Sequence, residues 1–246
     1  MAHKKPIHIL AKPEDISCFV LAAGDPNRIK MLSKLLKDFT LVNDNRGLLV
    51  YTGYWKDTRI TLATHGMGGP SSSIVFEELK MLGAEVIVRL GTTGSLTPAL
   101  KVGDLLVVQG AAYPKGHLEM YIPDGYMAAV PDLKVTNLLL EKAREMGIPV
   151  KLGIVFSSDA FYVEDVEFAK KWASRGVLSV EMECATLFVL SHLRGFKAGA
   201  LLVVSNSLVE NHSHELKGGL LRRKVIDAAK VIFESFTALK LKRKTI

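Results

Sequence analysis

The chain has 246 residues, of which 32 are basic, 25 are acidic and 48% are apolar. These proportions are typical of a folded globular protein and exclude a disordered or collagen-like chain. At this length, roughly 70% of the surface of the unfolded chain can be buried, so the fold needs neither disulfides nor a structural metal. Cys18 and Cys184 are far apart and form no metal-ligand spacing. We therefore expect two ordinary core thiols and a cytoplasmic protein.

The formal net charge of +7 is concentrated at the two ends of the chain. Most of the excess comes from Lys4, Lys5, Lys240, Lys242, Arg243 and Lys244. Because the remaining body is close to neutral, nucleic-acid binding is disfavoured. The longest apolar runs, such as 198–204, are far shorter than the ~20 residues of a membrane-spanning helix, so no membrane segment is expected. A single glutamine, Gln109, among many Lys and Glu residues favours a thermophilic source.

Short β-branched runs alternate with amphipathic stretches along the chain, a pattern typical of an α/β fold. The predicted strands are 17–23, 48–55, 58–64, 85–90, 104–108, 150–156, 177–180 and 198–205. One predicted helix begins at Pro26. The others cover 71–82, 132–146, 166–173, 182–193 and part of 215–240. We expect one domain over 1–246, a three-layer α/β/α arrangement around a twisted, mixed and mainly parallel sheet, with a basic tail at about 240–246.

Two predicted strands end beside glycine and arginine, and ligands of α/β sheets bind at such strand ends. Gly24 precedes Asp25, a candidate helix N-cap, and Arg28 lies on the first turn of the predicted helix, which outlines an anion site. Arg89 precedes Gly91-Thr92-Thr93-Gly94, which we predict to be a loop that offers backbone N–H groups and hydroxyls to an anion. Taken singly, each of these two motifs could equally be an ordinary structural turn. Arg46, taken alone, is consistent with a solvent-exposed arginine in a turn.

Two later segments offer groups that suit a nucleoside. Phe161 and Tyr162 could stack on a planar heterocycle, although filling the core is the commoner use of aromatic side chains. Glu181 and Glu183 lie where a predicted strand meets a helix, and residues two apart do not share a helical face. We therefore predict separate roles, with Glu183 accepting hydrogen bonds from ribose hydroxyls. The alternative is that both acids only stabilise a helix N-terminus.

The last strand and the loop after it carry further polar residues. Asn206 could hydrogen-bond to the edge of a heterocycle or cap the following turn. His212 and His214 have no neighbouring cysteine or carboxylate cluster, so solvated loop histidines are favoured over metal ligands.

Taken together and in this order, these segments resemble the hexameric nucleoside phosphorylase family, which includes purine nucleoside, uridine and methylthioadenosine phosphorylases. The resemblance rests on His8-Ile9-Leu10-Ala11-Lys12, Gly24-Asp25-Pro26-Asn27-Arg28, Asn45-Arg46-Gly47, Thr64-His65-Gly66-Met67-Gly68, Arg89-Leu90-Gly91-Thr92-Thr93-Gly94, Ser157-Ser158-Asp159-Ala160-Phe161-Tyr162 and Val180-Glu181-Met182-Glu183-Cys184-Ala185-Thr186. It covers nearly the whole chain and is greatest toward the archaeal purine and methylthioadenosine enzymes.

The resemblance implies reversible phosphorolysis of a ribonucleoside, purine type favoured, to a free base and ribose 1-phosphate, with inorganic phosphate as co-substrate and no cofactor or metal. It assigns phosphate binding to Gly24, Arg28, Arg46, Arg89 and Thr92, ribose binding to His8, Met67, Met182 and Glu183, and base binding to Thr93, Gly94, Phe161, Tyr162, Val180, Glu181 and Asn206. Arg28, Arg89 and Asn206 would act in catalysis. The family forms hexamers, trimers of dimers, in which His8 and Arg46 would complete the neighbouring subunit's site.

The chain departs from the family at the residues that read the base. Purine-type relatives place an aspartate, which protonates the leaving purine, where this chain has Asn206, and an amide cannot transfer a proton in that way. Uridine-type relatives carry Gln-x-Arg after the Phe-Tyr segment, whereas this chain has Val163-Glu164-Asp165-Val166. Uridine phosphorolysis therefore stays as the alternative. Lys217, Arg222 and His212 follow Asn206, but their spacing does not single out a proton donor.

Two alternative functions differ from phosphorolysis in mechanism. A nucleosidase would use water in place of phosphate, and three arginines beneath the sugar argue against it because a hydrolase gains little from that charge. A nucleoside-binding or tail-mediated nucleic-acid-binding protein without activity is the non-enzymatic alternative, disfavoured because the phosphate and ribose residues are all present.

Overall fold

The computed structural model describes residues 5–163, 165–209, 216 and 218–239. The basic tail from Lys240 onward, and His212, His214, Lys217 and Glu164, lie outside the described residues. The strands are β1 (Phe19–Ala23), β2 (Lys37–Asn43), β3 (Val50–Trp55), β4 (Thr58–Thr64), β5 (Val86–Ser95), β6 (Leu105–Ala112), β7 (Val150–Ser157), β8 (Val177–Glu181) and β9 (Lys197–Ser207). The α-helices are α1 (Pro26–Ser33), α2 (Gly69–Met81), α3 (Leu133–Glu145), α4 (Val166–Ala173), α5 (Cys184–Arg194) and α6 (Gly218–Ala238).

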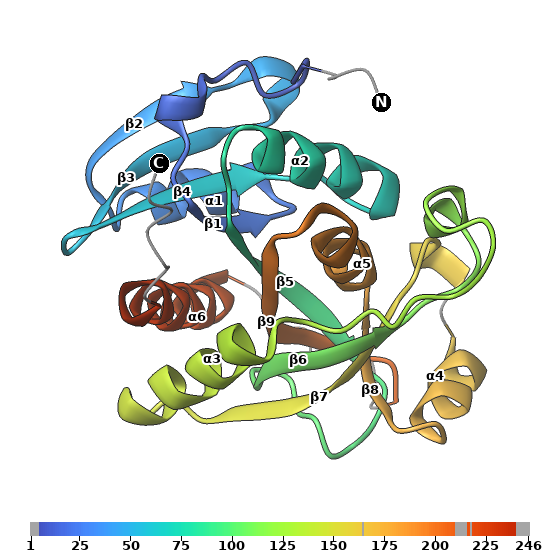
Figure 1. Ribbon diagram of the computed structural model, residues 1–246. Coiled ribbons are helices and arrows are strands. Elements are labelled where there is room, and N and C mark those ends of the chain that lie inside the picture. The colour runs from blue at the N-terminus through green and yellow to red at the C-terminus, as the bar shows by residue number, and fades with distance from the viewer. Residues whose placement is uncertain (1–4, 164, 210–215, 217, 240–246) are drawn as a thin grey trace.

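The strands form one mixed sheet with helices on both of its faces, which confirms the predicted α/β class (Figure 1). Their order is β2-β3-β4-β1-β5-β8-β7-β6-β9. Strand β1 runs parallel to β4 and β5, β5 parallel to β9, and β7 parallel to β6 and β8, whereas β2–β3, β3–β4, β5–β8 and β6–β9 are antiparallel. Because β9 also pairs with β5, the strands β5, β8, β7, β6 and β9 close into a ring at one side of the sheet.

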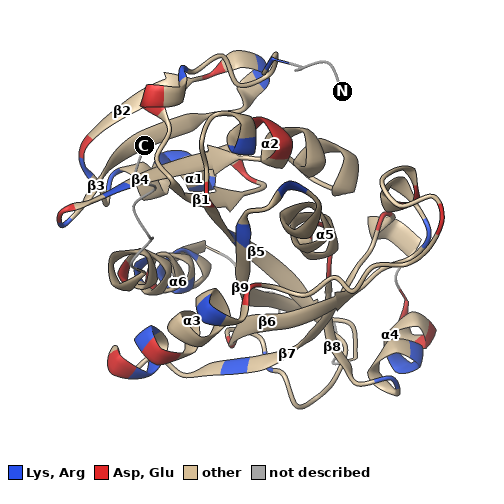
Figure 2. Ribbon diagram, in the orientation of Figure 1, with Lys and Arg blue, Asp and Glu red and all other residues tan. Residues whose placement is uncertain are grey.

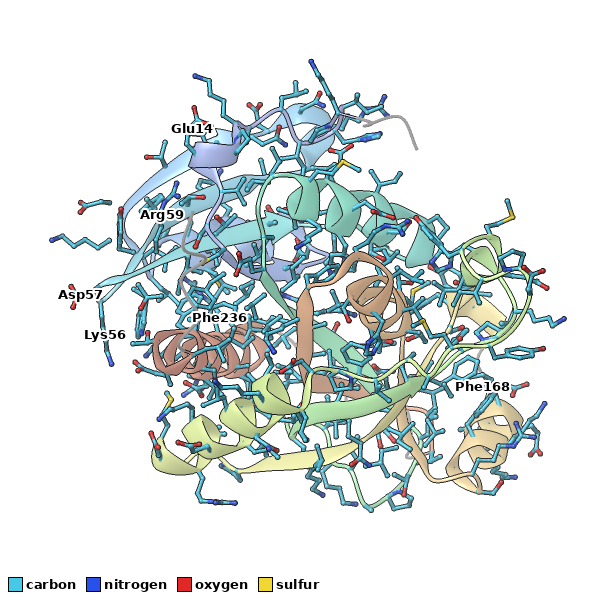
Figure 3. The ribbon with its side chains drawn as sticks, viewed as in Figure 1. Glu14, Lys56, Asp57, Arg59, Phe168 and Phe236 are labelled. Atoms are coloured by element: carbon cyan, nitrogen blue, oxygen red, sulfur yellow. The ribbon has the colours of Figure 1, made fainter. Side chains whose placement is uncertain are left out.

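Alternate residues of the central strands supply two hydrophobic layers, as the two-residue period of a strand requires. In β5, Val86 and Val88 pack with helices α1, α3 and α6, while Ile87 packs with α2 and α5 on the other face. Phe236 of α6, labelled in Figure 3, stacks on Phe19 of β1, with ring centroids 5.3 Å apart. Both faces of the sheet are thus covered, giving three layers.

The segment 91–94 is strand rather than the loop that the sequence suggested. Its backbone continues β5 and pairs with β9, from Gly91 opposite Leu202 to Gly94 opposite Asn206, with a register shift between Thr93 and Gly94. On the side that faces β9, the backbone groups of this segment therefore belong to the sheet, while its pairing with β1 ends at Arg89 and its pairing with β8 begins at Gly94. Tertiary pairing with the long buried strand β9 outweighs the loop tendency of a Gly-Thr-Thr-Gly sequence.

The remaining elements differ from the prediction mainly at their ends. Strand β2 was not predicted, because its residues are mostly exposed at the edge of the sheet and therefore show no apolar alternation. Asp25 caps α1 as predicted, accepting from the backbone N–H of Asn27, and Pro26 is the first helical residue. Helix α5 begins at Cys184, two residues later than predicted.

Acidic and basic residues are interspersed along α3 and α4 (Figure 2). Cys184 is buried and Cys18 is half-buried, and burial raises the pKa of both thiols. Over the described residues, no helix is long and apolar enough to cross a membrane, and no group of three or more His, Cys, Asp or Glu side chains could hold a metal ion.

Candidate active site

A cavity of about 790 Å³ lies where β1, β4, β5, β8 and β9 end, within the size range of small-molecule sites. Of the sixteen residues that the sequence assigned to a site, all but His8 and Tyr162 line it. The cavity is also lined by residues to which the sequence assigned no role in the site: Asp25, Pro26, Gly47, Leu48, Thr64, Gly66, Ser71, Ser205, Ser207 and Leu208. Five of these ten belong to the motifs quoted above, and Leu48, Ser205 and Ser207 adjoin a motif or an assigned residue, so proximity in sequence was the signal that could have found them.

One end of the cavity is cationic. Arg28 lies on the first turn of α1, half-buried, with Nη1 3.5 Å from the carbonyl oxygen of Leu90. Burial first, and then the nearby charge of Arg89, lower the pKa of Arg28. Gly24 approaches the backbone of the next loop so closely that a Cβ there would lie 2.7 Å from the oxygen of Gly66. Arg46, whose backbone has a φ of 56°, adds a third guanidinium to the cavity lining. The arginines make this part of the cavity suitable for a small polyanion.

Arg89 is buried in the middle of the cavity wall and binds both acids of the β8–α5 junction. Its Nη2 lies 3.0 Å from Oε2 of Glu181 and also contacts Oε2 of Glu183. Burial alone would lower the pKa of Arg89, but the two carboxylates raise it, Glu183 more strongly. The predicted helical start at these acids is displaced, because β8 ends at Glu181 and α5 begins only at Cys184, and the two carboxylates meet on one guanidinium; their separate roles stay a prediction. Neither acid lies on a helical face.

The two carboxylates differ in what else they bind. Glu181 accepts from Ser157 Oγ and from the backbone N–H groups of Glu183 and Cys184, at 2.8 and 3.0 Å for the two amides. Glu183 accepts from the backbone N–H of Gly68 at 2.7 Å. The inward-facing Glu181 thus fixes the junction, while Glu183 joins Arg89 to the loop that carries Met67.

His65 lies directly behind this loop and is fully buried. Its Nδ1 hydrogen-bonds with the oxygen of Gly66 at 2.8 Å, and its Nε2 has no partner in the described chain. Burial and the charge of Arg89 hold the pKa of His65 well below its ordinary value. The imidazole is therefore neutral, with Nδ1 donating and Nε2 bare, a state that the Thr-His-Gly-Met-Gly sequence did not reveal.

The opposite end of the cavity combines polar and apolar groups. Thr93 and Gly94 of β5 lie beside Val180 and Asn206, and the Thr93 hydroxyl donates to the oxygen of Val180 at 2.7 Å. Phe161 lines this end, whereas Tyr162 is 96% exposed and packs edge-on against Phe161 with centroids 5.2 Å apart. Arg222 lies away from the cavity, in a hollow with Asn27, Lys30, Met31 and Lys34.

His8 is held outside the cavity of its own chain. Its Nδ1 lies 2.7 Å from Oε1 of Glu78 on α2, and that buried carboxylate also accepts from the backbone N–H groups of Ile7, His8 and Ile9. Arg46, in contrast, lines the cavity of the chain to which it belongs. The sequence motif contained His8 but not Glu78, which is 70 residues away.

His117 supports the cavity from behind and was not singled out by the sequence. Its Nε2 lies 3.0 Å from the Thr186 hydroxyl on α5, and its ring packs against Gly69, where a Cβ would lie 1.9 Å from Cε1. Nδ1 is 3.9 Å from Oδ1 of Asp159, in the segment that leads to Phe161. The histidine therefore connects the starts of α2 and α5 with the segment before the aromatic pair.

The site has the composition of a pocket for an anion and a polar heterocyclic substrate, and comparison with known proteins places it in a family. Residues 19–237 match the model of the phosphorylase superfamily, and the chain belongs to this superfamily. It is 39% identical over 205 residues to a purine nucleoside phosphorylase, DeoD-type, of Caldanaerobacter subterraneus subsp. tengcongensis, which covers 82% of this chain and 88% of that protein.

Two further relatives carry a different substrate in their names. A uridine phosphorylase of Thermococcus kodakarensis is 33% identical over 223 residues, 83% of this chain and 78% of that protein. The crystal structure of a uridine phosphorylase from Vibrio fischeri superposes with a TM-score of 0.87 at 26% identity, covering 97% of this chain and all of that one. The family resemblance seen in the sequence is confirmed, with both purine and uridine enzymes among the relatives.

Proposed function

We propose that this protein is a nucleoside phosphorylase, a pentosyltransferase that moves the ribosyl group of a nucleoside to inorganic phosphate, with purine nucleosides favoured. The observation that carries the proposal is that Arg28, Arg46 and Arg89 line one cavity, whose wall also holds Glu183 in contact with Arg89. Membership of the phosphorylase superfamily and the names of the relatives support it.

The chemistry follows from that arrangement. Phosphorolysis passes through a ribosyl cation-like state, and a phosphate dianion held beneath C1′ both stabilises the developing charge and captures it. Arg28, Arg46 and Arg89, together with Gly24 and Thr92, would hold the phosphate. The carboxylate of Glu183 would accept the ribose hydroxyls, with Met67 and Met182 packing against the sugar. Because Glu183 touches Arg89, sugar and phosphate would be positioned by one network.

The base would occupy the end lined by Thr93, Gly94, Phe161, Val180 and Asn206. We assign Glu181, whose side chain is fully buried, to positioning Arg89 and Glu183 rather than to contact with the base through its carboxylate. Uridine is the alternative substrate, since relatives named for uridine match nearly as well. A nucleosidase is disfavoured by the cationic end, which water as nucleophile would not need.

We further propose a homo-oligomer, a hexamer built as a trimer of dimers, in which His8 serves the neighbouring site. His8 lies outside the cavity of its own chain, and the Glu78 carboxylate fixes its Nδ1, which leaves Nε2 available to a ribose 5′ group of a second copy. Arg46 already lines its own cavity, so the same guanidinium would lie at the junction of the two copies. The low cysteine content favours a cytoplasmic location.

The deciding experiment incubates the purified protein with inosine, guanosine, adenosine, methylthioadenosine and uridine, each with and without phosphate, and quantifies free base and ribose 1-phosphate. Phosphate-dependent release of a purine is the expected result. Release of uracil alone assigns the protein to uridine, and equal cleavage without phosphate identifies a nucleosidase. Binding without any cleavage would overturn the proposed activity and identify a nucleoside-binding protein.

A further inference from the structure

His117 lies outside the main cavity, at the start of a 3₁₀ turn (His117–Met120) that packs against α2. Its side chain is only 16% exposed, and burial lowers its pKa, so the imidazole is neutral near pH 7. The proposed phosphorolysis gives this histidine no role. Three of its contacts nevertheless lead to segments whose other residues line the cavity.

The first contact is with the loop that carries Met67. The imidazole of His117 packs against the backbone of Gly69, where a Cβ would lie 1.9 Å from Cε1 and 2.4 Å from Nδ1, so any side chain at this position displaces the ring. The preceding residue, Gly68, donates its backbone N–H to Glu183 at 2.7 Å. The histidine thus limits the position of the loop that joins Met67 to the carboxylate proposed to bind ribose.

The second contact is with the beginning of α5. Nε2 of His117 lies 3.0 Å from the hydroxyl of Thr186, and because the carboxylate of Asp159 near Nδ1 favours a proton there, Nε2 accepts from this hydroxyl. A hollow of only about 10 Å³, room for about one water, is lined by both His117 and Met182. Met182 also lines the main cavity, so its side chain belongs to both walls and has almost no free space toward His117.

The third contact is with the segment that leads to Phe161. Oδ1 of Asp159 lies 3.9 Å from Nδ1 of His117, and Oδ2 lies so close to Gly116 that a Cβ on this glycine would be 2.2 Å from it. The carboxylate therefore packs against the backbone just before the histidine. Because Phe161 follows two residues later and lines the cavity, these contacts limit how far the aromatic side chain can move.

We propose that His117 is a positioning residue for the nucleoside, which holds the loop of Met67, the junction of Met182 and Glu183 and the segment of Phe161 in place without touching the substrate. The inference rests on the proposed phosphorolysis and adds a residue to it. The phosphate residues are held by other elements: Arg28 lies on α1, and Arg89 has its own ion pair with Glu181. Loss of the imidazole should therefore impair use of the nucleoside while the affinity for phosphate is retained.

The experiment measures kcat and the KM of each substrate, with the nucleoside that the wild type cleaves fastest among inosine, guanosine, adenosine, methylthioadenosine and uridine. His117→Ala leaves a void beside Met182, so kcat/KM for the nucleoside should fall by about 10- to 100-fold, as expected when reacting groups are displaced by about 1 Å. The KM for phosphate should stay close to that of the wild type. An equal loss for the two substrates would overturn the inference, because general damage to the fold has that effect.

Further variants separate positioning from folding. His117→Gln keeps a planar polar group that can reach the hydroxyl of Thr186, so it should recover most of the loss in kcat/KM. Gly69→Ala displaces the unaltered ring and should reproduce the loss, which decides the matter if His117→Ala does not fold. His192→Ala, the control, removes an exposed histidine of α5 that lies 3.0 Å from the oxygen of Val130, and should change neither constant. Wild-type kinetics in Gly69→Ala, or a glutamine variant no better than the alanine variant, would contradict the role of the ring.

A readout without substrate separates this inference from the proposed activity. Hydrogen exchange is followed at the amides of Gly68 and Ala160, which donate to the side chains of Glu183 and Ser158. Exchange at both amides should accelerate by about tenfold in His117→Ala and stay unchanged in the control variant. If the wild type cleaves no nucleoside but this acceleration occurs, the proposed activity is wrong and the positioning of these segments stands. If nucleosides are cleaved and exchange at both amides is unchanged, the positioning is wrong.

Discussion

Arg89 and Glu181 form a buried ion pair in which Nη2 lies 3.0 Å from Oε2, and Arg89 reaches past it to Glu183. The pair joins β5 to the end of β8, which are antiparallel neighbours only at Gly94–Val180 and Ser95–Ser179. Arg89, which we propose to bind phosphate, is thus held in place by Glu181, to which we assign a positioning role. The stability of the fold and the affinity for phosphate are therefore expected to change together when this network is altered.

Glu181→Gln should lower the free energy of unfolding by about 3 kcal/mol, because it removes a charge that compensates the buried Arg89. Urea unfolding followed by circular dichroism measures the change. Glu141→Gln, at an exposed helix position, is the control and should shift stability by less than about 0.5 kcal/mol. Equal effects of the two substitutions would show that the buried pair does not contribute to stability.

Arg28→Ala should raise the KM for phosphate by about 10- to 100-fold with a much smaller change in the KM for the nucleoside, since it deletes charge-assisted hydrogen bonds to the anion only. Arg28 is chosen because it makes no ion pair with the two glutamates, so the fold is retained. Arg144→Ala, on the exposed face of α3, removes the same charge and should leave both constants unchanged. A larger effect on the nucleoside would place phosphate elsewhere.

Gly91→Ala tests the packing of Arg89 without changing any charge. A Cβ at this position would lie 2.1 Å from Nη1 and 2.6 Å from Cζ of Arg89, so the guanidinium must shift away from its two carboxylates. The KM for phosphate should rise about tenfold and the Tm should fall. Gly125→Ala, where a Cβ meets nothing within 4 Å, should leave both unchanged. Wild-type kinetics for Gly91→Ala would mean that Arg89 tolerates displacement.

Glu78→Ala should release the segment that carries His8. Hydrogen exchange of the amides of Ile7, His8 and Ile9, all of which donate to this carboxylate, should accelerate by about tenfold or more. Glu77→Ala, one residue earlier on α2, loses only a bridge to Arg194 and should leave this exchange unchanged. If His8 serves a neighbouring site, the KM for the nucleoside should also rise in Glu78→Ala. Unchanged exchange would show that other contacts anchor the segment.

His65 should make stability depend on pH. Burial holds its native pKa well below about 6.5, so the unfolded chain takes up a proton that the native state does not as the pH falls. The contribution of His65 to the free energy of unfolding is complete above about pH 6.5. Below that value it decreases by about 1.4 kcal/mol per pH unit, down to the native pKa of His65. Between about pH 7.5 and 5.5, the wild type should lose about 1.4 kcal/mol more in urea unfolding than His65→Asn, whose amide retains a donor near the Gly66 oxygen. Parallel pH profiles would show that His65 has the same pKa in the native state as in the unfolded chain.

Local sequence was sufficient for much of the fold. Asp25 and Pro26 begin α1 because a carboxylate can cap the helix and a fixed φ suits its first residue, both of which are local effects. The amphipathic period of 132–146 likewise predicted α3, for which Asp132 supplies the cap. Strand β2 escaped detection because an exposed edge strand needs no apolar alternation.

The sequence by itself indicated most of the residues that gather at the cavity, because strand ends of an α/β sheet converge, several motifs follow a strand, and the family resemblance assigned roles to the rest. Only the tertiary structure decided how those residues are connected. The pairing of β5 with β9 turned the Gly-Thr-Thr-Gly segment into strand, and the contacts of Arg89 with Glu181 and of His8 with Glu78 span 92 and 70 residues of chain. Such contacts depend on the free energy of burying charges and amides together, which no local pattern encodes.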